Sequence, residues 1–525
     1  MVKVLISDKL SPAAIQIFKD RGVDVDVKTG LAPEELKAII GDYDGLAIRS
    51  NTKVTSDILG AATKLKVVGR AGIGVDNVDI PAATARGVVV MNTPFGNSIT
   101  TAEHAIALMF ALARDIPEAN ASTHAGKWEK NRFMGVEVTG KTLGIIGCGN
   151  IGSIVADRGV GLRMKVVAFD PFLSEEKAVK LGIEKVELDE LLARADFITL
   201  HTPLTNATRD IINADAFAKM KKGVRIINCA RGGLIVEDDL TAALESGKVA
   251  GVALDVFKNE PAKEHPLFGR ANVIVTPHLG ASTGEAQENV ALQVAEQISD
   301  YLLTGAVINA LNMPSVSAED APRLRPYIQL ANQLGSFAGQ LTENAISDVK
   351  IEYMGAVASL NTRPLTAALL QGLLEPSLEG VNMVNAPVVA KERGVAVSEA
   401  TSETCPDYNT MVRLTVTASG KTRAVSGTLF GGSKPRIIEI KGISIEAEMK
   451  PNLLYITNKD KPGFIGRLGT LLGKYDINIA TFQLGRIAAG DDAIALIEVD
   501  QQLDENVLAE VKSIPNVIQV KPLHF

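Results

Sequence analysis

The 525-residue sequence predicts an α/β protein built around a doubly wound parallel sheet. Three observations support this fold class. Apolar strand patterns recur from residue 142 to residue 276, and helical patterns separate them. A glycine-rich turn, Gly147-Cys-Gly-Asn-Ile-Gly152, follows the first of these strands and opens a helix. Such strand–helix alternation is typical of sheets that carry helices on both faces.

Composition narrows the possible classes of protein. With 46% hydrophobic residues, the chain can bury several cores, and its length suggests three or four domains at about 150 residues each. The net charge of −7 argues against nucleic acid as the main partner. The cysteines, Cys148, Cys229 and Cys405, are too scattered for a disulfide framework or a metal site. The apolar run at residues 105–113 is too short to span a membrane, so we expect a soluble cytoplasmic protein.

The first elements alternate between strand and helix. In residues 1–98, helical patterns at 12–20 and 33–40 separate strand patterns, which predicts an α/β domain with a parallel sheet. A helix at about 100–114 is apolar on all sides and should be buried. Six strands of the doubly wound sheet then follow at residues 142–146, 165–169, 197–201, 224–228, 250–254 and 273–276.

The rest of the chain should fold as further domains. A helix at 285–303 is expected to return to the first domain, so we divide the chain into a discontinuous domain (1–98 and 286–314) and a nucleotide domain (99–285). Residues 315–326, with mixed charge and prolines at 322 and 326, predict a linker. Residues 327–451 predict an α+β domain. Residues 452–525 carry a β-α-β-β-α-β pattern, which is typical of a ferredoxin-like module.

The glycine turn indicates a dinucleotide site of the Rossmann type. Gly147 and Gly149 would let backbone N–H groups approach a pyrophosphate, and Gly152 would let the next helix pack close to its strand. Asp170 lies 18 residues beyond Gly152, where a carboxylate accepts a bond from a ribose 2′-hydroxyl and repels a 2′-phosphate. The glycines alone are a weak signal, but the flanking strand and helix support a dinucleotide site. The acid favours NAD over NADP.

Three further side chains follow strands at the same edge of the sheet. Arg231 could bind a substrate carboxylate with two N–H groups, and His278 could move a proton to or from a hydroxyl. Glu260 could bond the other ring nitrogen of that histidine and favour its charged form. Each side chain also has a simpler explanation: a surface ion pair, a loop histidine, or a turn residue before a proline.

Together these motifs resemble a known family. Gly147-Cys-Gly-Asn-Ile-Gly152, Asn228-Cys-Ala-Arg-Gly-Gly233, Ala253-Leu-Asp-Val-Phe-Lys-Asn-Glu-Pro261 and Pro277-His-Leu-Gly-Ala-Ser-Thr283 are similar to motifs of the D-isomer-specific 2-hydroxyacid dehydrogenases. The resemblance covers essentially the whole chain, and it points to the long members, which carry an intervening domain and a regulatory domain at the C-terminal end.

The resemblance implies an NAD-dependent enzyme that oxidises the 2-hydroxyl of 3-phosphoglycerate, with Arg231, Glu260 and His278 as the catalytic residues. It also implies a flavodoxin-like substrate-binding fold for the discontinuous domain, and a homodimer or homotetramer. The positions that it implies for cofactor contacts are Ile73, Gly147, Gly149, Asn150, Ile151, Gly152, Asp170, Thr202, Cys229, Ala230, Arg231, Asp255, His278 and Gly280.

Substrate choice is expected in the first domain. Arg49, followed by Ser50, and Arg70 each end a predicted strand, where two guanidinium groups could hold a phosphate. Solvated arginines are the alternative. Lys130 and Arg132 match a family segment that reaches the neighbouring subunit's site, although a surface basic cluster explains them equally well.

The last module resembles an ACT domain, on its fold pattern and on the turn Asn458-Lys-Asp-Lys-Pro-Gly-Phe-Ile-Gly466. Such modules commonly bind amino acids, so the resemblance implies L-serine as an effector. Asp460 would hold its amino group, and Asn478 would bond its carboxylate or hydroxyl. Ordinary folding signals explain both residues as well.

Two other functions stay open at this point. One is another D-2-hydroxyacid dehydrogenase, which acts on a small unphosphorylated substrate. The other is a non-catalytic NAD-sensing corepressor or binding protein, because a fold alone does not fix its function. Formation of NADH from 3-phosphoglycerate would separate these possibilities.

Overall fold

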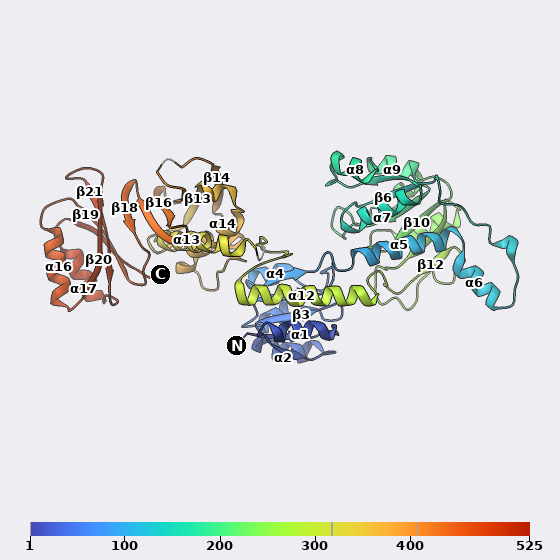
Figure 1. Cartoon of the computed structure of the whole chain (residues 1–525), viewed down its shortest axis with the longest axis horizontal. Coiled ribbons are helices and arrows are strands. Elements are labelled where there is room, and N and C mark those ends of the chain that lie inside the picture. Colours follow the sequence, from blue (N-terminus) through green and yellow to red (C-terminus); the bar gives the residue numbers. More distant parts are fainter. Residues whose placement is uncertain (1, 317–318, 406) are drawn as a thin grey trace.

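The computed structural model describes residues 2–316, 319–405 and 407–525. Its strands form four sheets in an elongated molecule, with the nucleotide domain at one end and the last β-α-β-β-α-β module at the other (Figure 1). Among the described residues, no helix combines the length and the apolar character needed to cross a membrane.

The first sheet is parallel, in the order β2 (Asp24–Val27), β1 (Lys3–Ile6), β3 (Gly45–Ile48), β4 (Val67–Arg70) and β5 (Val89–Asn92). Helices α1 (Pro12–Asp20), α2 (Pro33–Ile39), α3 (Ser56–Ala61) and α4 (Ile80–Ala85) connect its strands. The sequence prediction missed β2, because this edge strand reads Asp-Val-Asp-Val and is only partly buried.

Helix α12 (Gly284–Thr304) returns from the far end of the nucleotide domain to the first sheet. It lies so close to β4 that a Cβ added to Gly69 would come within 2.6 Å of the Ile298 side chain. Ile298 is fully buried in the same cluster as Val4 and Met91. Helix α12 therefore packs on the first sheet, as expected from the sequence.

The second sheet confirms the predicted fold class. Its order is β12 (Val273–Val275), β11 (Val249–Leu254), β10 (Val224–Asn228), β9 (Phe197–Leu200), β6 (Thr142–Ile146), β7 (Lys165–Phe169) and β8 (Glu184–Lys185), with all neighbours parallel. The prediction missed only β8, which has two residues. The helices are α5 (Ser98–Ala113), α6 (Ile116–His124), α7 (Asn150–Gly161), α8 (Glu175–Leu181), α9 (Leu188–Arg194), α10 (Ala214–Lys219) and α11 (Glu237–Glu245).

The third sheet belongs to the α+β segment. Its order is β14 (Ala396–Ser402), β13 (Ile346–Gly355), β15 (Thr410–Ala418), β16 (Lys421–Phe430), β17 (Lys434–Ile440) and β18 (Ile443–Ala447). Helices α13 (Ala321–Gln340), α14 (Arg363–Leu374) and α15 (Ala386–Glu392) accompany it. Strand β14 is exposed along almost all of its length, so it lacks the apolar alternation from which a strand is predicted.

The linker predicted over residues 315–326 is wrong in its second half, because α13 begins at Ala321. Residues 317 and 318 of that linker lie outside the described residues. Pro322 is tolerated in the first turn, where backbone N–H groups have no partner within the helix. Pro326 lies inside the helix, and the buried side chains Leu324 and Leu330 anchor this segment to the core.

The fourth sheet has the order β20 (Ile479–Arg486), β21 (Asp492–Val499), β19 (Leu453–Lys459) and β22 (Val517–Leu523), and its strand pairs are antiparallel. With α16 (Phe464–Lys474) and α17 (Glu505–Ser513), it forms the predicted ferredoxin-like module. Helices α16 and α17 pack against one face of the sheet. The other face joins the core of the third sheet, where the rings of Phe337 and Tyr455 meet edge to face with centroids 5.9 Å apart.

Candidate active site

Many of the predicted cofactor residues lie at the carboxyl ends of neighbouring strands in the second sheet. Strand order reverses between β6 and β9, and ligands of open α/β sheets bind at such a switch point. The residues that follow β6, β7, β9, β10 and β11 closely are Gly147, Asp170, Thr202, Cys229 and Asp255.

The glycine turn has the close packing that its sequence predicts. Gly147 has a φ of +90°, and a Cβ there would lie 2.6 Å from the Thr202 side chain. A Cβ at Gly152 would lie 2.0 Å from the carbonyl oxygen of Gly147. Above Gly149 there is open space, so an anion can approach this backbone and the first residues of α7, Asn150 and Ile151.

Two more groups at this turn fit a dinucleotide. The Asp170 carboxylate accepts bonds from the N–H groups of Cys148 (2.7 Å) and Phe172 (2.8 Å), which hold it beside the turn. The buried hydroxyl oxygen of Thr202 has no hydrogen-bond partner among the described residues. Because buried polar groups are normally paired, a bound ligand is a natural partner for this hydroxyl.

His278 and Glu260 form the predicted pair. His278 Nδ1 lies 2.6 Å from Glu260 Oε2, and the N–H of Phe257 donates to Glu260 Oε1 at 2.9 Å. The hydrogen bond to Glu260 raises the pKa of His278 above its usual 6.5. Burial alone would raise the pKa of Glu260, but its bonds to His278 and Phe257 lower that pKa overall. Nδ1 is thus engaged with Glu260, and Nε2 remains for proton transfer.

A buried carboxylate fixes the backbone around His278, whose φ is +57°. Asp255 is fully buried, and it accepts bonds from the Thr276 hydroxyl (2.6 Å) and from the N–H groups of Leu279 (2.7 Å) and Gly280 (2.8 Å). These bonds hold residues 276–280 in place. Asp255 therefore supports the loop that carries His278 from inside the protein.

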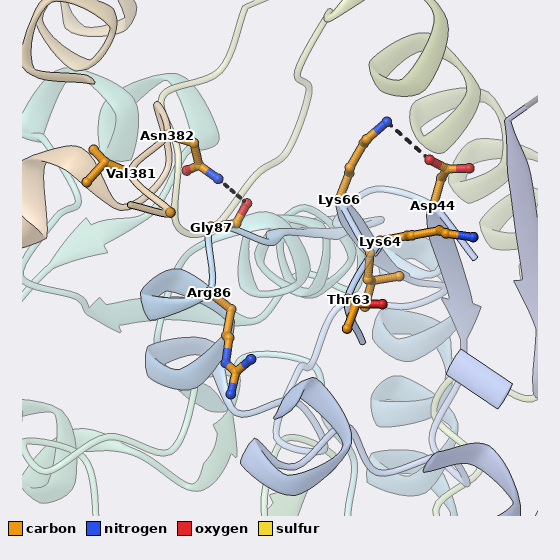
Figure 2. Close-up of a pocket in the computed structure, with 10 residues that line it drawn as sticks. Asp44, Thr63, Lys64, Lys66, Arg86, Gly87, Val381 and Asn382 are labelled. Carbon is orange, nitrogen blue, oxygen red and sulfur yellow. Dashed lines mark hydrogen bonds and ion pairs between the residues drawn. The ribbon is translucent and has the colours of Figure 1, made fainter. Parts of the chain in front are cut away.

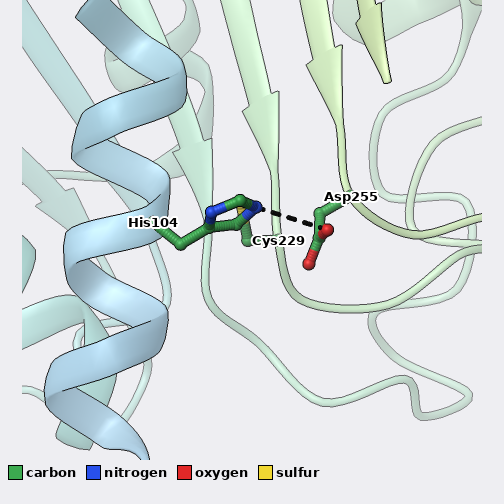
Figure 3. Close-up of side chains that lie close together, drawn as sticks. All are labelled: His104, Cys229 and Asp255. Carbon is green, nitrogen blue, oxygen red and sulfur yellow. Dashed lines mark ion pairs between the residues drawn. The ribbon is translucent and has the colours of Figure 1, made fainter. Parts of the chain in front are cut away.

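His104 and Cys229 lie beside Asp255 (Figure 3). His104 Nε2 is 3.3 Å from an Asp255 oxygen, and potential metal-ligand atoms of all three residues lie within 4.8 Å of one another. The Asp255 oxygens already accept bonds from the chain, and burial raises the pKa of the Cys229 thiol and disfavours the thiolate. The arrangement suits a loop anchor. Sequence reasoning missed His104, because no motif marked this helical position.

Arg231 contacts the first domain. Its Nε donates to Asp76 at 2.9 Å, and its Nη1 donates to the carbonyl oxygen of Ala230 at 2.7 Å. The Nη2 group, which lies against Gly74, has no hydrogen-bond partner among the described residues. Asp76 stands six residues after Arg70, but sequence reasoning did not identify it as the partner of Arg231.

Arg70 lies in the same cationic site. Burial, followed by the positive charges of Arg231 and Arg49, lowers the pKa of Arg70 to about 10, which leaves it charged at neutral pH. Its buried Nε has no hydrogen-bond partner among the described residues. A buried cation with an unused donor, close to other cations, favours an anionic ligand.

The loop that carries Arg49 and Ser50 is also fixed. The N–H of Arg49 donates to Asp8 at 2.6 Å, and the Asn77 side chain donates to the carbonyl oxygen of Arg49 at 2.6 Å. Ser50 is exposed. The remaining predicted positions, Ile73, Ala230 and Gly280, lie in the loops after β4, β10 and β12 and are held through the Asn92, Asn228 and Asp255 side chains.

Lys130 and Arg132 are not joined to this site within the chain. They lie in a short 3-10 helix, η2 (Lys130–Arg132), beyond the projecting helix α6 (Figure 1). Arg132 pairs with Glu129 at 3.1 Å and with Glu118 at 3.5 Å, and Lys130 is exposed.

The two predicted effector residues have partners in their own module. The Asp460 carboxylate pairs with Arg486 and accepts the N–H of Gly490 at 3.2 Å. The Asn478 side chain donates to Asp500 at 2.9 Å. An amino acid at this position would have to displace these contacts.

Comparisons with known proteins agree along the chain. Residues 106–280 match the NAD-binding domain of the D-isomer specific 2-hydroxyacid dehydrogenases, residues 323–441 match the D-3-phosphoglycerate dehydrogenase intervening domain, and residues 453–516 match the ACT domain. The chain is 45% identical to D-3-phosphoglycerate dehydrogenase of Synechocystis, over 98% of this chain and 94% of that one. It is 44% identical to the enzyme of the same name from Methanocaldococcus jannaschii, over all of both chains.

Solved structures match about three fifths of the chain. D-2-hydroxyisocaproate dehydrogenase superposes with a TM-score of 0.54 at 27% identity, over 59% of this chain and 99% of that one. D-Lactate dehydrogenase from Aquifex aeolicus, in complex with NAD and lactic acid, gives a TM-score of 0.53 at 25% identity, over 60% of this chain and all of that one.

Proposed function

The chain belongs to the D-3-phosphoglycerate dehydrogenases, within the D-isomer-specific 2-hydroxyacid dehydrogenase family, and we propose that it oxidises 3-phospho-D-glycerate to 3-phosphohydroxypyruvate with NAD. This is the first step of L-serine biosynthesis. The observation that carries the assignment is the His278–Glu260 pair, at 2.6 Å, on the sheet edge that also bears Arg231.

The pair supplies the proton chemistry. His278 Nε2 takes the proton of the substrate 2-hydroxyl, and Glu260 stabilises the imidazolium that results. NAD, which the turn Gly147–Gly152 and Asp170 would hold, would supply the acceptor for the hydride of C2. The products are the 2-oxo acid, NADH and one proton held by His278, so atoms and charge balance.

Three arginines give the site its preference for an anionic substrate. Arg231 keeps its Nη2 end for the substrate carboxylate, because its Nε edge is bonded to Asp76. Arg70 and Arg49 hold the phosphate from the first domain. The buried Nε of Arg70, which has no hydrogen-bond partner among the described residues, supports this division of roles.

The test is spectrophotometric. We expect NADH to form with 3-phosphoglycerate and far more slowly with D-lactate or D-glycerate. His278→Ala should lose about 10²–10⁴-fold in kcat and still bind NADH. Equal turnover of unphosphorylated acids would favour the alternative of another D-2-hydroxyacid dehydrogenase. Binding of NADH without any turnover would favour a corepressor.

Regulation by L-serine through the ACT domain is a finer proposal. We propose that serine binds near Asp460 and Asn478, where its amino group takes the place of Arg486 on the Asp460 carboxylate. Serine should then inhibit the wild type, and Asp460→Ala should be insensitive while it keeps its activity. Full wild-type activity in millimolar serine, with no heat of binding, would remove the effector role.

We also propose a cytoplasmic homodimer or homotetramer in which Lys130 and Arg132 approach a neighbouring subunit's cleft. The mass in solution, measured by light scattering, tests the assembly. A monomer that is fully active would leave these two residues as a surface basic cluster.

A further inference from the structure

Glu260 lies in a loop that follows β11, residues 256–268, which we call the Glu260 loop. Three rings of this loop pack together. The His265 ring lies 5.2 Å from that of Phe257 and 5.5 Å from that of Phe268, and the two phenylalanine rings meet edge to face at 5.6 Å. The loop is therefore anchored on both sides of Glu260, which is itself exposed.

One carboxylate of helix α11 joins the two sides of this loop. Glu237, in the first turn of α11, accepts the backbone N–H of Lys258 at 3.1 Å with Oε1, and its Oε2 lies 3.2 Å from His265 Nε2. The N–H of Leu267 donates to His265 Nδ1 at 3.3 Å, so a proton on Nε2 points to Glu237. The His265 side chain is 10% exposed, and water therefore screens this contact only in part.

The bond between Lys258 and Glu237 is adjacent to the bond that holds Glu260. The N–H of Phe257 donates to Glu260 Oε1 at 2.9 Å, and the next N–H along the chain donates to Glu237. Glu260 contacts His278 with its other oxygen. A shift of these two peptide groups would therefore move the Glu260 carboxylate relative to the histidine ring.

The segment before α11 packs against the same peptide groups. A Cβ added to Gly232 would lie 2.0 Å from the carbonyl carbon of Phe257 and 2.4 Å from the backbone nitrogen of Lys258. Because these obstacles are backbone atoms, they cannot rotate away. Gly232 directly follows Arg231, so this contact and the Glu237 bonds hold the Glu260 loop against the segment that carries Arg231.

We propose that Glu237 is a positioning residue, which together with His265 holds the Glu260 loop so that the Glu260 carboxylate stays on His278 Nδ1. This inference rests on the proposed dehydrogenase function, in which that carboxylate stabilises the imidazolium. Glu237 acts through Glu260, so its replacement should weaken the bond between Glu260 and His278.

The titration of His278 reports the strength of that bond. The bond to Glu260 raises the pKa of His278 and burial lowers it, while the charge of Asp255 raises this pKa and that of Arg231 lowers it. Of these three charged groups, Glu260 is the one on the loop that Glu237 holds. Loss of the Glu237 carboxylate should therefore lower the pKa of His278, although every group that faces the ring is kept.

Glu237→Gln is the first test, because its NH2 group would face one of the two donors that the carboxylate accepts. NMR titration of the full chain with isotope-labelled histidine rings measures the pKa of His278 without NAD or substrate, and His278→Ala identifies its signal. The pKa should be lower in Glu237→Gln than in the wild type, and lower still in Glu260→Gln. His265→Asn, which leaves Glu237 in place, should lower it as well.

A double variant tests whether Glu237 acts through Glu260. In Glu237→Gln/Glu260→Gln the pKa of His278 should equal that of Glu260→Gln, because residues that act in one chain of contacts are not additive. In the kinetics, kcat of Glu237→Gln should fall roughly tenfold with the Kd of NADH unchanged, since a displacement of about 1 Å can cost up to about 100-fold.

Two controls separate this effect from a general loss of contacts. Glu245 also lies on α11 and pairs with Arg270, beyond the Glu260 loop, at 3.0 Å, so Glu245→Ala is the matched control. Asn382→Ala removes the bond to the carbonyl oxygen of Gly87, at 3.0 Å, between the intervening domain and the first domain (Figure 2). Both variants should leave kcat and the pKa of His278 unchanged.

An unchanged pKa in Glu237→Gln, an equal shift in Glu245→Ala, or additive shifts in the double variant would overturn the proposal. The titration requires no turnover. A lowered pKa in a chain that does not oxidise 3-phosphoglycerate would therefore support the positioning role and refute the proposed function.

Discussion

At the scale of residues, the short bond between His278 and Glu260 makes the activity depend on pH. Oxidation needs neutral His278, so kcat/KM rises as pH rises through the pKa of this histidine. Glu260 raises that pKa. Glu260→Gln should therefore move the acid limb to lower pH, as followed by initial rates of NADH formation across pH. A profile that does not move would make Glu260 a structural residue.

The bond from Asp76 should orient Arg231 without blocking it. Asp76→Asn removes the charge from a bond of 2.9 Å, and we expect KM for 3-phosphoglycerate to rise roughly three- to tenfold, with the Kd of NADH unchanged. Asp57→Asn is a matched control, since Asp57 is an equally exposed carboxylate of the same domain, paired with Lys37. Equal effects of the two changes would show a general charge effect.

Asp170 should select the cofactor. Its carboxylate lies at the glycine turn, fixed by the N–H groups of Cys148 and Phe172. Asp170→Ala should raise KM for NAD and narrow its advantage over NADP, because the repulsion of a 2′-phosphate is lost. Steady-state kinetics with both cofactors measure this ratio. Equal use of both cofactors by the wild type would contradict the role.

At the scale of elements, helices α13 and α14 touch through glycines. A Cβ at Gly372 would lie 2.0 Å from the carbonyl oxygen of Asn332, and one at Gly335 would lie 2.1 Å from that of Leu369. Because the obstacles are backbone atoms, they cannot rotate away. This contact brings the two helices as close as their backbones allow.

Gly372→Ala should therefore lower the stability of the intervening domain by about 2 kcal/mol or more. Gly469→Ala in α16, where the added methyl group meets nothing within 4 Å, should change stability by no more than about 1 kcal/mol and should favour folding. Hydrogen exchange in each helix reports both effects. Equal stability of the two variants would contradict the close packing.

At the scale of the whole molecule, the sheet of the ACT domain contributes side chains to two hydrophobic cores. Tyr455 and Leu496 belong to the core of the intervening domain, while the opposite face of the sheet covers α16 and α17. Removal of residues 452–525 should therefore expose Phe337 and its neighbours, lower the unfolding temperature in calorimetry and increase the binding of a hydrophobic dye. An unchanged transition would show that the two domains are independent.

The sequence by itself predicted most strands of the first two sheets, the glycine turn and the acid after it, and it singled out Arg231, Glu260 and His278, whose catalytic roles remain a prediction. These follow from local patterns, namely apolar periodicity and the placing of polar residues directly after parallel strands. The division of the chain into domains remains a prediction made from those patterns.

Tertiary structure alone decided which distant residues meet. Asp76 and Arg231 are 155 positions apart, and Gly87 and Asn382 are 295 apart, so no local pattern could pair them. The start of α13 at Ala321 and the exposed strand β14 also depend on packing and on neighbouring strands. Local propensity fixes elements, but contacts between elements depend on the free energy of the whole packed chain.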